Sequence, residues 1–473
     1  MFKADTIAAL ATPPGEGGIA IVRVSGPSAR SIAKQVFQPH RGDDPATYSG
    51  YSVHYGAFVS APQGEVIDDG LLTVFRAPHS YTGEDTIELA CHGGRVTSGN
   101  VLTLTLQAGA RLAEPGEFTL RAFLNGRLDL AQAEAVADVI RARTDASCRL
   151  ARRQLEGSLS QAILTLKDEL VGILAAIEVT IDFSEEVGEL EHEPILHRIQ
   201  TVQAGIGNLL ANADRGRILR EGLRVAIVGR PNVGKSSLLN ALLRTERAIV
   251  TPIAGTTRDV VEESASVQGI PVVFVDTAGI RPTSDLVEQI GVERATHAAA
   301  SADVLLFVLD AETGITEKDK VVAKTIGGKI LVVINKCDLA SEKQLQAVQE
   351  QSLSLFSYPI AGVVTISAQL GVSLNLLEEI LIEVGTGNSS LKGGQETGSL
   401  SDSVIVANTR HQQALQSAER SLEEARMTTL QRLPGDFIAI DVRGALDALG
   451  LITGETVTDD IIHRIFQDFC VGK

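Results

Sequence analysis

The stretch Gly229-Arg230-Pro231-Asn232-Val233-Gly234-Lys235-Ser236-Ser237 matches the pattern G-x-x-x-x-G-K-[ST] at every position. It follows the apolar run 225–228 and precedes a helix-like run at 238–243, which is the strand, loop and helix context that this motif requires. In that context, backbone N–H groups and the positive helix end surround phosphates, Lys235 reaches the β- and γ-oxygens, and Ser236 binds Mg²⁺. The stretch therefore predicts a nucleoside triphosphate site on an α/β sheet.

A second motif, Asn335-Lys336-Cys337-Asp338, follows the apolar run 330–334, so it lies at the strand end where α/β sheets place ligands. A carboxylate only accepts hydrogen bonds, and guanine offers two adjacent donors. Asp338 can accept both, whereas adenine would present an acceptor and leave a charge unpaired. Ser367-Ala368, after the run 363–366, is placed to support the base from the next strand. In register with the phosphate loop, these residues indicate guanine.

Two further strings are typical of a GTP-hydrolysing site. Asp276-Thr277-Ala278-Gly279 places Asp276 near the metal and the Gly279 N–H near the γ-phosphate. Gly255-Thr256-Thr257-Arg258-Asp259 favours a switch loop in which Thr257 is a second Mg²⁺ ligand, although an ordinary polar turn is the alternative. GTPases of the Ras kind place glutamine after D-x-x-G to orient water, and here that residue is Ile280. Hydrolysis therefore requires another group to position water and another positive charge.

Composition limits the class of protein. A chain of 473 residues favours two or three domains, and 44% hydrophobic with 21% charged residues is a soluble globular profile. The sequence shows neither a membrane-length apolar stretch nor an N-terminal targeting pattern. Four widely spaced cysteines favour a reduced, cytoplasmic setting. The net charge of −17 argues against broad nucleic-acid binding but allows a local basic face.

The pattern along the chain predicts a multidomain α/β plus all-α protein. Residues 1–118 mix short apolar runs with glycine and proline turns, as a small α/β domain would. Helical apolar spacing covers 119–219 and returns over 404–473. Between them lie the nucleotide-binding pattern, 220–384, and a Gly- and Ser-rich flexible linker, 385–403. We therefore expect a nucleotide-binding domain with a doubly wound sheet, inserted into a discontinuous helical domain.

Other strings leave more than one interpretation open. Thr12-Pro13-Pro14-Gly15-Glu16-Gly17-Gly18 lacks the lysine and serine of a phosphate loop, which argues against a second nucleotide site. Tyr81-Thr82-Gly83-Glu84-Asp85, with Glu88, and His92-Gly93-Gly94 fit either a ligand pocket or turns. At the end of the chain, the thiol in Phe469-Cys470-Val471-Gly472-Lys473 fits either small core filler or a tail that reaches into a neighbouring pocket.

Over its whole length the chain resembles the MnmE (TrmE) family of tRNA-modification GTPases of bacteria and organelles. The resemblance rests on the strings above, with Pro115-Gly116-Glu117-Phe118, Arg121-Ala122-Phe123-Leu124-Asn125 and Leu128-Asp129-Leu130-Ala131-Gln132-Ala133-Glu134. Val471 stands where the family more often has Ile or Leu.

The resemblance implies a second site in the N-terminal domain, for a one-carbon tetrahydrofolate such as the 5-formyl or methylene form. Arg23, Glu88, Arg127 and Lys473 match the family's ligand positions, and Arg127 stands where some members have lysine. The family acts as a homodimer through this domain. With the FAD protein MnmG it adds an aminomethyl-type group, such as carboxymethylaminomethyl, to C5 of the wobble uridine in tRNA. Cys470 matches a cysteine expected among the catalytic residues, with its chemical role open.

The resemblance also implies how hydrolysis proceeds with Ile280 in place of glutamine. In this family K⁺ takes the place of an arginine finger, held by Asn232 and the backbone at Thr251, Ile253 and Thr256, and it supplies positive charge beside the phosphates. Glu288 matches the water-positioning glutamate, although a solvated helix charge is the alternative. We expect GTP, Mg²⁺ and K⁺ to bind at one site. Its residues are Asn232, Val233, Gly234, Lys235, Ser236, Ser237, Thr251, Pro252, Ile253, Ala254, Gly255, Thr256, Thr257, Asp276, Thr277, Ala278, Gly279, Asn335, Lys336, Asp338, Ser367 and Ala368.

A ribosome-assembly GTPase of the Era or Der kind is the alternative function, because such proteins share the phosphate loop and an asparagine-dependent use of K⁺. They carry either an RNA-binding domain after the GTPase domain or a second GTPase domain. Here a helical segment that ends in Cys470 follows instead, which favours tRNA modification.

Overall fold

A computed structural model describes residues 5–42, 44–60, 64–188, 190–245, 263–275, 301–387, 404–467 and 469–473. The chain forms two compact units. The first comprises Met1–Ala137, Gln154–Asp168 and Arg443–Lys473, and the second comprises Asp138–Arg153 and Glu169–Val442. Residues of both units occur in helices α4 (Leu130–Arg141), α5 (Asp145–Leu155), α6 (Ser158–Asp182) and α16 (Gly435–Thr453).

The first unit is built on a seven-stranded sheet in the order β3-β4-β5-β6-β2-β1-β7. All neighbouring strands are antiparallel except β1 and β7. The strands are β1 (Ile7–Leu10), β2 (Gly17–Ser25), β3 (Phe37–Pro39), β4 (Ser52–Ser60), β5 (Glu65–Phe75), β6 (Thr86–Gly93) and β7 (Arg111–Leu112), with the short helix η1 (Pro45–Thr47) before β4. Helices α1 (Ala29–Val36) and α2 (Arg95–Gln107) contribute to its apolar core, which contains Ile32, Val101 and Leu89.

A smaller apolar cluster joins the end of the chain to this unit. Helix α3 (Glu117–Leu124) begins where the Pro-Gly-Glu string predicts a helix start. Leu120 of α3 packs in one core with Leu130 and with Ile462 and Phe466 of α17 (Asp459–Gln467). Phe469, just beyond α17, belongs to the same core. Residues more than 300 positions apart in the sequence are therefore neighbours in this unit.

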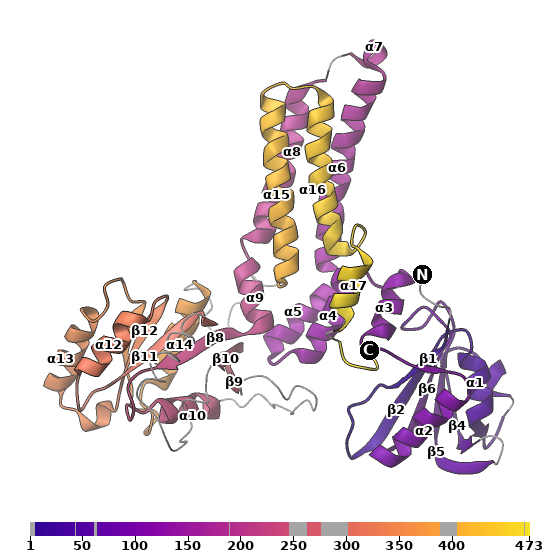
Figure 1. Ribbon diagram of the computed structural model, residues 1–473, viewed down its shortest axis with the longest axis horizontal. Coiled ribbons are helices and arrows are strands. Elements are labelled where there is room, and N and C mark those ends of the chain that lie inside the picture. The colour runs from indigo at the N-terminus through magenta and orange to yellow at the C-terminus, as the bar shows by residue number, and fades with distance from the viewer. Residues whose placement is uncertain are drawn as a thin grey trace. The chain divides into compact units, whose positions relative to one another are not determined.

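The second unit contains helices that run side by side in Figure 1, among them α8 (His192–Leu210) and α15 (Thr409–Leu430). Residues at three- and four-residue spacing form the buried face of α8, including Ile195, Ile199 and Val202, which is the pattern of an amphipathic helix. The two helices contact one another, although the chain between them includes the whole nucleotide-binding pattern. The short helix α7 (Ser184–Val187) precedes α8, and α9 (Ala213–Glu221) follows it.

The other part of this unit is a six-stranded sheet in the order β13-β12-β11-β8-β10-β9. All neighbours are parallel except β9 and β10. The strands are β8 (Leu223–Val228), β9 (Glu263–Val267), β10 (Ile270–Val275), β11 (Val304–Asp310), β12 (Ile330–Asn335) and β13 (Gly362–Thr365). The helices are α10 (Lys235–Thr245), α12 (Glu317–Thr325), η3 (Cys337–Leu339), α13 (Glu342–Leu353) and α14 (Leu374–Thr386).

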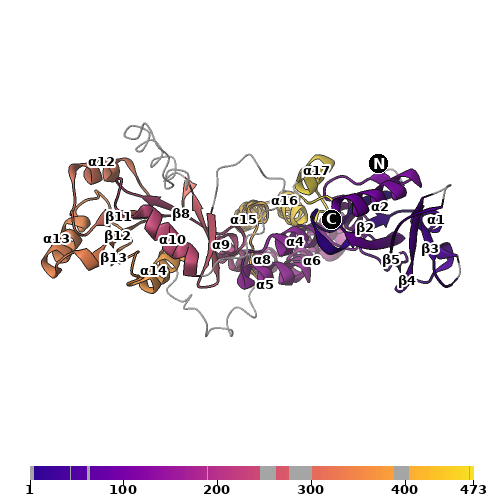
Figure 2. The same ribbon diagram turned by 90° about the horizontal axis from the view of Figure 1, so that it is seen from below.

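Both faces of this mainly parallel sheet are covered. Alternate residues of β8 pack into two different cores, one shared with α10 and α14 and the other with α12 and α13. Figure 2 shows α12 and α14 on opposite sides of the strands. Such burial explains why β11 and β12 are apolar at nearly every position. Among the described residues, no helix is both long and apolar enough to cross a membrane.

Candidate functional site

The phosphate-loop motif has the local structure that the sequence predicts. Buried strand β8 ends at Val228, the glycine loop follows, and α10 begins at Lys235. The Lys235 ammonium donates to the carbonyl oxygens of Gly229 at 2.7 Å and Arg230 at 2.8 Å, and burial lowers its pKa. Gly234 has a φ of +96°, and a Cβ there would lie 2.2 Å from Asn335 Nδ2. Only glycine therefore fits at this position.

Asn335 connects three parts of this site. It ends β12, is 2% exposed, and its Nδ2 donates to the Val233 carbonyl at 2.9 Å. Its Oδ1 accepts from the Ala368 N–H at 3.0 Å. One buried amide thus holds the phosphate loop and the segment after β13 in fixed positions. The spacing of the motifs in the sequence does not show this direct link.

The other residues of the base motif lie at the same edge of the sheet. Lys336 has a left-handed backbone with φ 64°, and Asp338 lies exposed in η3. Ser367 is fully buried and follows β13. These placements leave the Asp338 carboxylate accessible to a ligand, with the buried Ser367 and Ala368 beside the motif.

The remaining residues predicted for this site divide into described and undescribed groups. Ser236 and Ser237 lie exposed in the first turn of α10, and Asn232 is exposed with φ 68°. The switch and catalytic positions lie outside the described residues, and they are Thr251, Pro252, Ile253, Ala254, Gly255, Thr256, Thr257, Asp276, Thr277, Ala278, Gly279, Ile280 and Glu288.

Sequence reasoning missed two acidic residues beside the two nucleotide motifs. Asp310, the last residue of β11, accepts from the Lys336 ammonium at 2.6 Å. Asp319, which is fully buried in α12, pairs with Arg230 of the phosphate loop at 3.3 Å. The sequence offered one signal for Asp310, namely its position at the end of an apolar run. In α/β sheets, ligands bind at the carboxyl ends of the strands.

A second cluster of candidate side chains lies in the first unit. Arg23 on β2 and Glu88 on β6 are direct cross-strand partners. Arg23 Nε donates to Glu88 Oε1 at 2.9 Å. The pair is mostly buried, with side-chain exposures of 14% and 22%. Because these residues are 65 positions apart in sequence, only the pairing of strands brings them together.

Aromatic rings and a second cation complete this cluster. The Arg23 guanidinium lies 5.3 Å from the ring centre of Tyr81 and 5.7 Å from that of Phe118, and the Lys473 ammonium lies 5.9 Å from the Tyr81 ring centre. Burial, and next the charge of Arg23, lower the pKa of Lys473. Two cations that share a partly buried space form an environment suited to a bound anion.

The C-terminal tail is held close to this cluster by glycines. Arg23 Nη1 donates to the Gly472 carbonyl at 3.5 Å. Gly472 has a φ of +95°, and a Cβ there would lie 2.4 Å from the Leu10 carbonyl oxygen. Cys470 is exposed, and its carbonyl accepts from the Gly116 N–H at 3.4 Å. The tail therefore reaches a neighbouring cluster, which agrees with one of the two interpretations that the sequence leaves open.

Arg127 is the fourth predicted residue of this cluster. It is exposed, and its Cγ lies 3.4 Å from where a Cβ on Gly83 would be. It therefore lies beside the turn that carries Tyr81. The structure thus brings Arg23, Glu88 and Lys473 together, with Arg127 at the adjoining turn.

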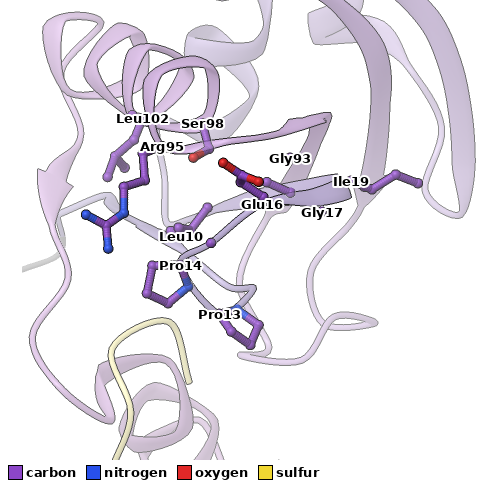
Figure 3. A pocket seen from close by; sticks show the side chains of 13 residues that line it. Leu10, Pro13, Pro14, Glu16, Gly17, Ile19, Gly93, Arg95, Ser98 and Leu102 are labelled. Carbon is purple, nitrogen blue, oxygen red and sulfur yellow. The ribbon is translucent and has the colours of Figure 1, made fainter. Parts of the chain in front are cut away.

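A separate hollow of about 350 Å³ lies between the loop before β2 and the first turn of α2. Figure 3 shows Pro13 and Pro14 on the loop side and Arg95 on the helix side. Its lining includes Gly93 of the His92-Gly93-Gly94 string and Pro13 to Glu16 of the loop before β2, but none of the residues assigned to the nucleotide site or to the Arg23 cluster.

Strand, glycine loop and helix, with the asparagine-linked base motif at the neighbouring strand end, define a GTP-binding protein of the P-loop class. Two protein-family models match this chain and agree with that class. Residues 130–470 match the model "MnmE helical domain", and residues 6–127 match "GTP-binding protein TrmE N-terminus".

Two curated relatives are similar over almost the whole length of the chain. The tRNA modification GTPase MnmE of Moorella thermoacetica is 47% identical over 99% of this chain and 99% of its own. The protein of the same name from Carboxydothermus hydrogenoformans is 48% identical, also over 99% of both chains. Among solved structures, a variant of Era from Aquifex aeolicus bound to GDP and AlF₄⁻ is 35% identical, covers 33% of this chain and 55% of its own, and has a TM-score of 0.27. The chain belongs to the MnmE family of tRNA modification GTPases.

Proposed function

We propose that this chain is a GTP-hydrolysing enzyme of tRNA modification. Together with MnmG it adds an aminomethyl-type group, such as carboxymethylaminomethyl, to C5 of the wobble uridine of certain tRNAs. The observation that carries the proposal is the likeness over 99% of the chain to proteins named tRNA modification GTPase. The linkage of phosphate loop and base motif through Asn335 supports a working GTP site in this member.

The nucleotide site fits GTP with Mg²⁺. Lys235 and the N-terminus of α10 provide positive charge for phosphates, and Ser236 at the start of that helix would hold the metal. Asp338 would accept the two guanine donors, with Ser367 and Ala368 supporting the base. We extend the proposal to the undescribed positions, with Thr257 as second Mg²⁺ ligand, Asp276 near the metal and Glu288 orienting water. Asn232 and the backbone at Thr251, Ile253 and Thr256 would hold K⁺.

The first unit fits a reduced folate with one carbon unit. A pterin offers hydrogen-bond donors to the Glu88 carboxylate, and the glutamate portion offers carboxylates to Arg23, Arg127 and Lys473. Convergence of two cations, a carboxylate and the rings of Tyr81 and Phe118 supports this assignment. A bound folate would supply the one-carbon unit. Cys470 in the adjoining tail is proposed as a participant in that reaction.

The proposed working form is a homodimer joined through its N-terminal domains and associated with MnmG. We propose five functional parts, with the nucleotide-binding part containing a doubly wound sheet that is inserted into the helical part. They are the folate-binding domain 1–118, the helical parts 119–219 and 404–473, the GTPase domain 220–384 and the linker 385–403. K⁺-dependent pairing of GTPase domains would drive the cycle.

The test is wobble-uridine analysis in the source organism after deletion of this protein. Mass spectrometry of digested tRNA should lose the C5-substituted uridine, and the unchanged chain should restore it. Lys235→Ala should fail to restore it, while Glu317→Gln, a surface change in α12, should succeed. Normal uridine modification with accumulating ribosome precursors would support the Era or Der alternative instead.

A further inference from the structure

The loop between β11 and α12 contacts both nucleotide motifs through a different acidic residue at each end. At its start, Asp310 is 3% exposed. One oxygen accepts from the N–H groups of Glu312 at 2.9 Å and Thr313 at 3.3 Å, and the other accepts from Lys336 at 2.6 Å. Burial opposes ionisation of Asp310, but these hydrogen bonds outweigh it, so the pKa of the carboxyl is lowered. Asp310 is therefore a charged, fully occupied acceptor.

At the other end, Asp319 holds the phosphate loop. One of its oxygens accepts from the Thr316 N–H at 2.9 Å and hydroxyl at 2.8 Å, and faces Arg230 at 3.3 Å. Arg230 also donates to the Thr313 hydroxyl and, at 3.5 Å, to the Gly314 carbonyl. Its guanidinium is therefore committed to residues 313–319, which argues against Arg230 as the positive charge at the γ-phosphate.

These contacts are unlike ordinary surface ion pairs. Asp310 and Asp319 are nearly or fully buried, and a buried carboxylate is stable only with a partner. In contrast, Glu317 of the same segment pairs with Lys320 on the surface. The two buried acids therefore hold Lys336 and Arg230 in fixed positions, while Glu317 has no such role.

We propose that Asp310 and Asp319, at the two ends of the segment between β11 and α12, are positioning residues of the nucleotide site. Asp310 fixes Lys336 within the base motif that also carries Asp338, and Asp319 fixes the phosphate loop through Arg230. The two acids touch no nucleotide themselves, so they act through the two cations. This inference rests on the proposed GTP-binding function and adds positioning residues to it.

The test compares the full chain with Asp310→Asn. An asparagine can still accept from Glu312 and Thr313, but it lacks the charge that holds Lys336. Loss of one charge-assisted hydrogen bond should speed dissociation of fluorescent GTP and GDP analogues about tenfold or more. The affinities for GTP and ITP should fall by the same factor, because recognition of the exocyclic amine is assigned to Asp338, which this variant leaves unchanged. The kcat at saturating GTP should stay within about twofold.

Two further variants separate positioning from a general structural effect. In a Lys336→Gln background, Asp310→Asn should add little, because the residue through which it acts is gone. Glu317→Gln should leave GTP dissociation unchanged. Equal dissociation rates in Asp310→Asn and the parent, or a full Asp310→Asn effect that persists without Lys336, would overturn the inference. A parent chain that fails to bind GTP would instead overturn the proposed function on which it rests.

Discussion

At the scale of single residues, Asn335 shows how one buried amide can set the distance between two loops. Its two hydrogen bonds, to Val233 and from Ala368, leave Asp338 three positions later exposed toward solvent. The two residues differ for a physical reason. Asn335 is a buried polar group and needs its hydrogen-bond partners, whereas Asp338 must be free to exchange water for the base.

Changing Asp338 to Asn should weaken GTP binding and admit xanthosine triphosphate. Xanthine carries an oxygen where guanine has its amine, so a carboxamide donor can meet it. Competition titrations measure the affinity of the parent and the variant for GTP and XTP, and for ITP as a third ligand. Undiminished GTP affinity in this variant would contradict the assignment of Asp338 to base recognition.

Lys473 should make folate binding sensitive to alkaline pH. Its pKa is lowered by burial and by Arg23, so its positive charge is lost at a lower pH than that of an ordinary lysine. Affinity for 5-formyltetrahydrofolate should therefore fall as the pH rises through that lowered pKa. Lys473→Arg stays charged and should hold its affinity to higher pH in calorimetric titrations. A parent affinity that is flat from neutral to about pH 10 would count against a charged contact.

At the scale of elements, two glycines with nearly the same backbone allow a matched comparison. Gly116 has φ +69°, and a Cβ there would lie 2.5 Å from the Phe466 carbonyl of α17, whereas Gly126 has φ +68° and nothing within 4 Å. Alanine at either position carries about 1–2 kcal/mol of backbone strain. Only at Gly116 does it also displace α17 and the tail.

Gly116→Ala should therefore destabilise the first unit by about 1–3 kcal/mol more than Gly126→Ala. It should also weaken folate binding and leave GTP binding unchanged. Scanning calorimetry suits the measurement because the chain contains no tryptophan. Equal stability and equal folate affinity in the two variants would show that the packing of α17 against α3 does not support the site.

Elements that depend on local pattern were predictable from the sequence, and contacts between distant residues were not. The apolar run before Gly229 forms β8, and the run before Asn335 forms β12, because both faces of these strands are buried. Periodicity could not place Tyr81 and Phe118 beside Arg23, because the turn between β5 and β6 and the start of α3 bring them there. Asp310 could be seen as a polar strand end, but its partner Lys336 is 26 positions away.

At the scale of the whole molecule, hydrolysis should depend on K⁺. Ile280 cannot orient water, and Arg230 is engaged by Asp319, so another positive charge is needed. GTP turnover should be much faster in K⁺ than in Na⁺ at equal ionic strength. Asn232→Ala should remove this stimulation and spare nucleotide binding. Equal turnover in the two salts would contradict the K⁺ proposal.

Coupling between hydrolysis and tRNA modification can be tested at Glu288. Glu288→Ala should slow single-turnover hydrolysis by about a hundredfold or more, the range of a positioned acid–base group, with GTP affinity near normal. Modification of tRNA should fail as well, although Arg23, Glu88, Arg127 and Cys470 are unchanged. Slow hydrolysis with full tRNA modification would support the catalytic role of Glu288 but contradict the proposed coupling of hydrolysis to modification. Normal hydrolysis would instead support the alternative interpretation of Glu288 as a solvated helix charge.

The pairing of α8 with α15 also has a consequence during synthesis on the ribosome. Helix α8 ends at Leu210 and α15 begins at Thr409, so α8 emerges long before the helix that covers it. At about 5–20 residues per second, that interval lasts roughly 10–40 s. Throughout it, Ile195, Ile199, Val202, Ile206 and Leu209 lack the partner that buries them. We therefore expect the nascent chain to bind a holding chaperone at α8 until α15 has been made.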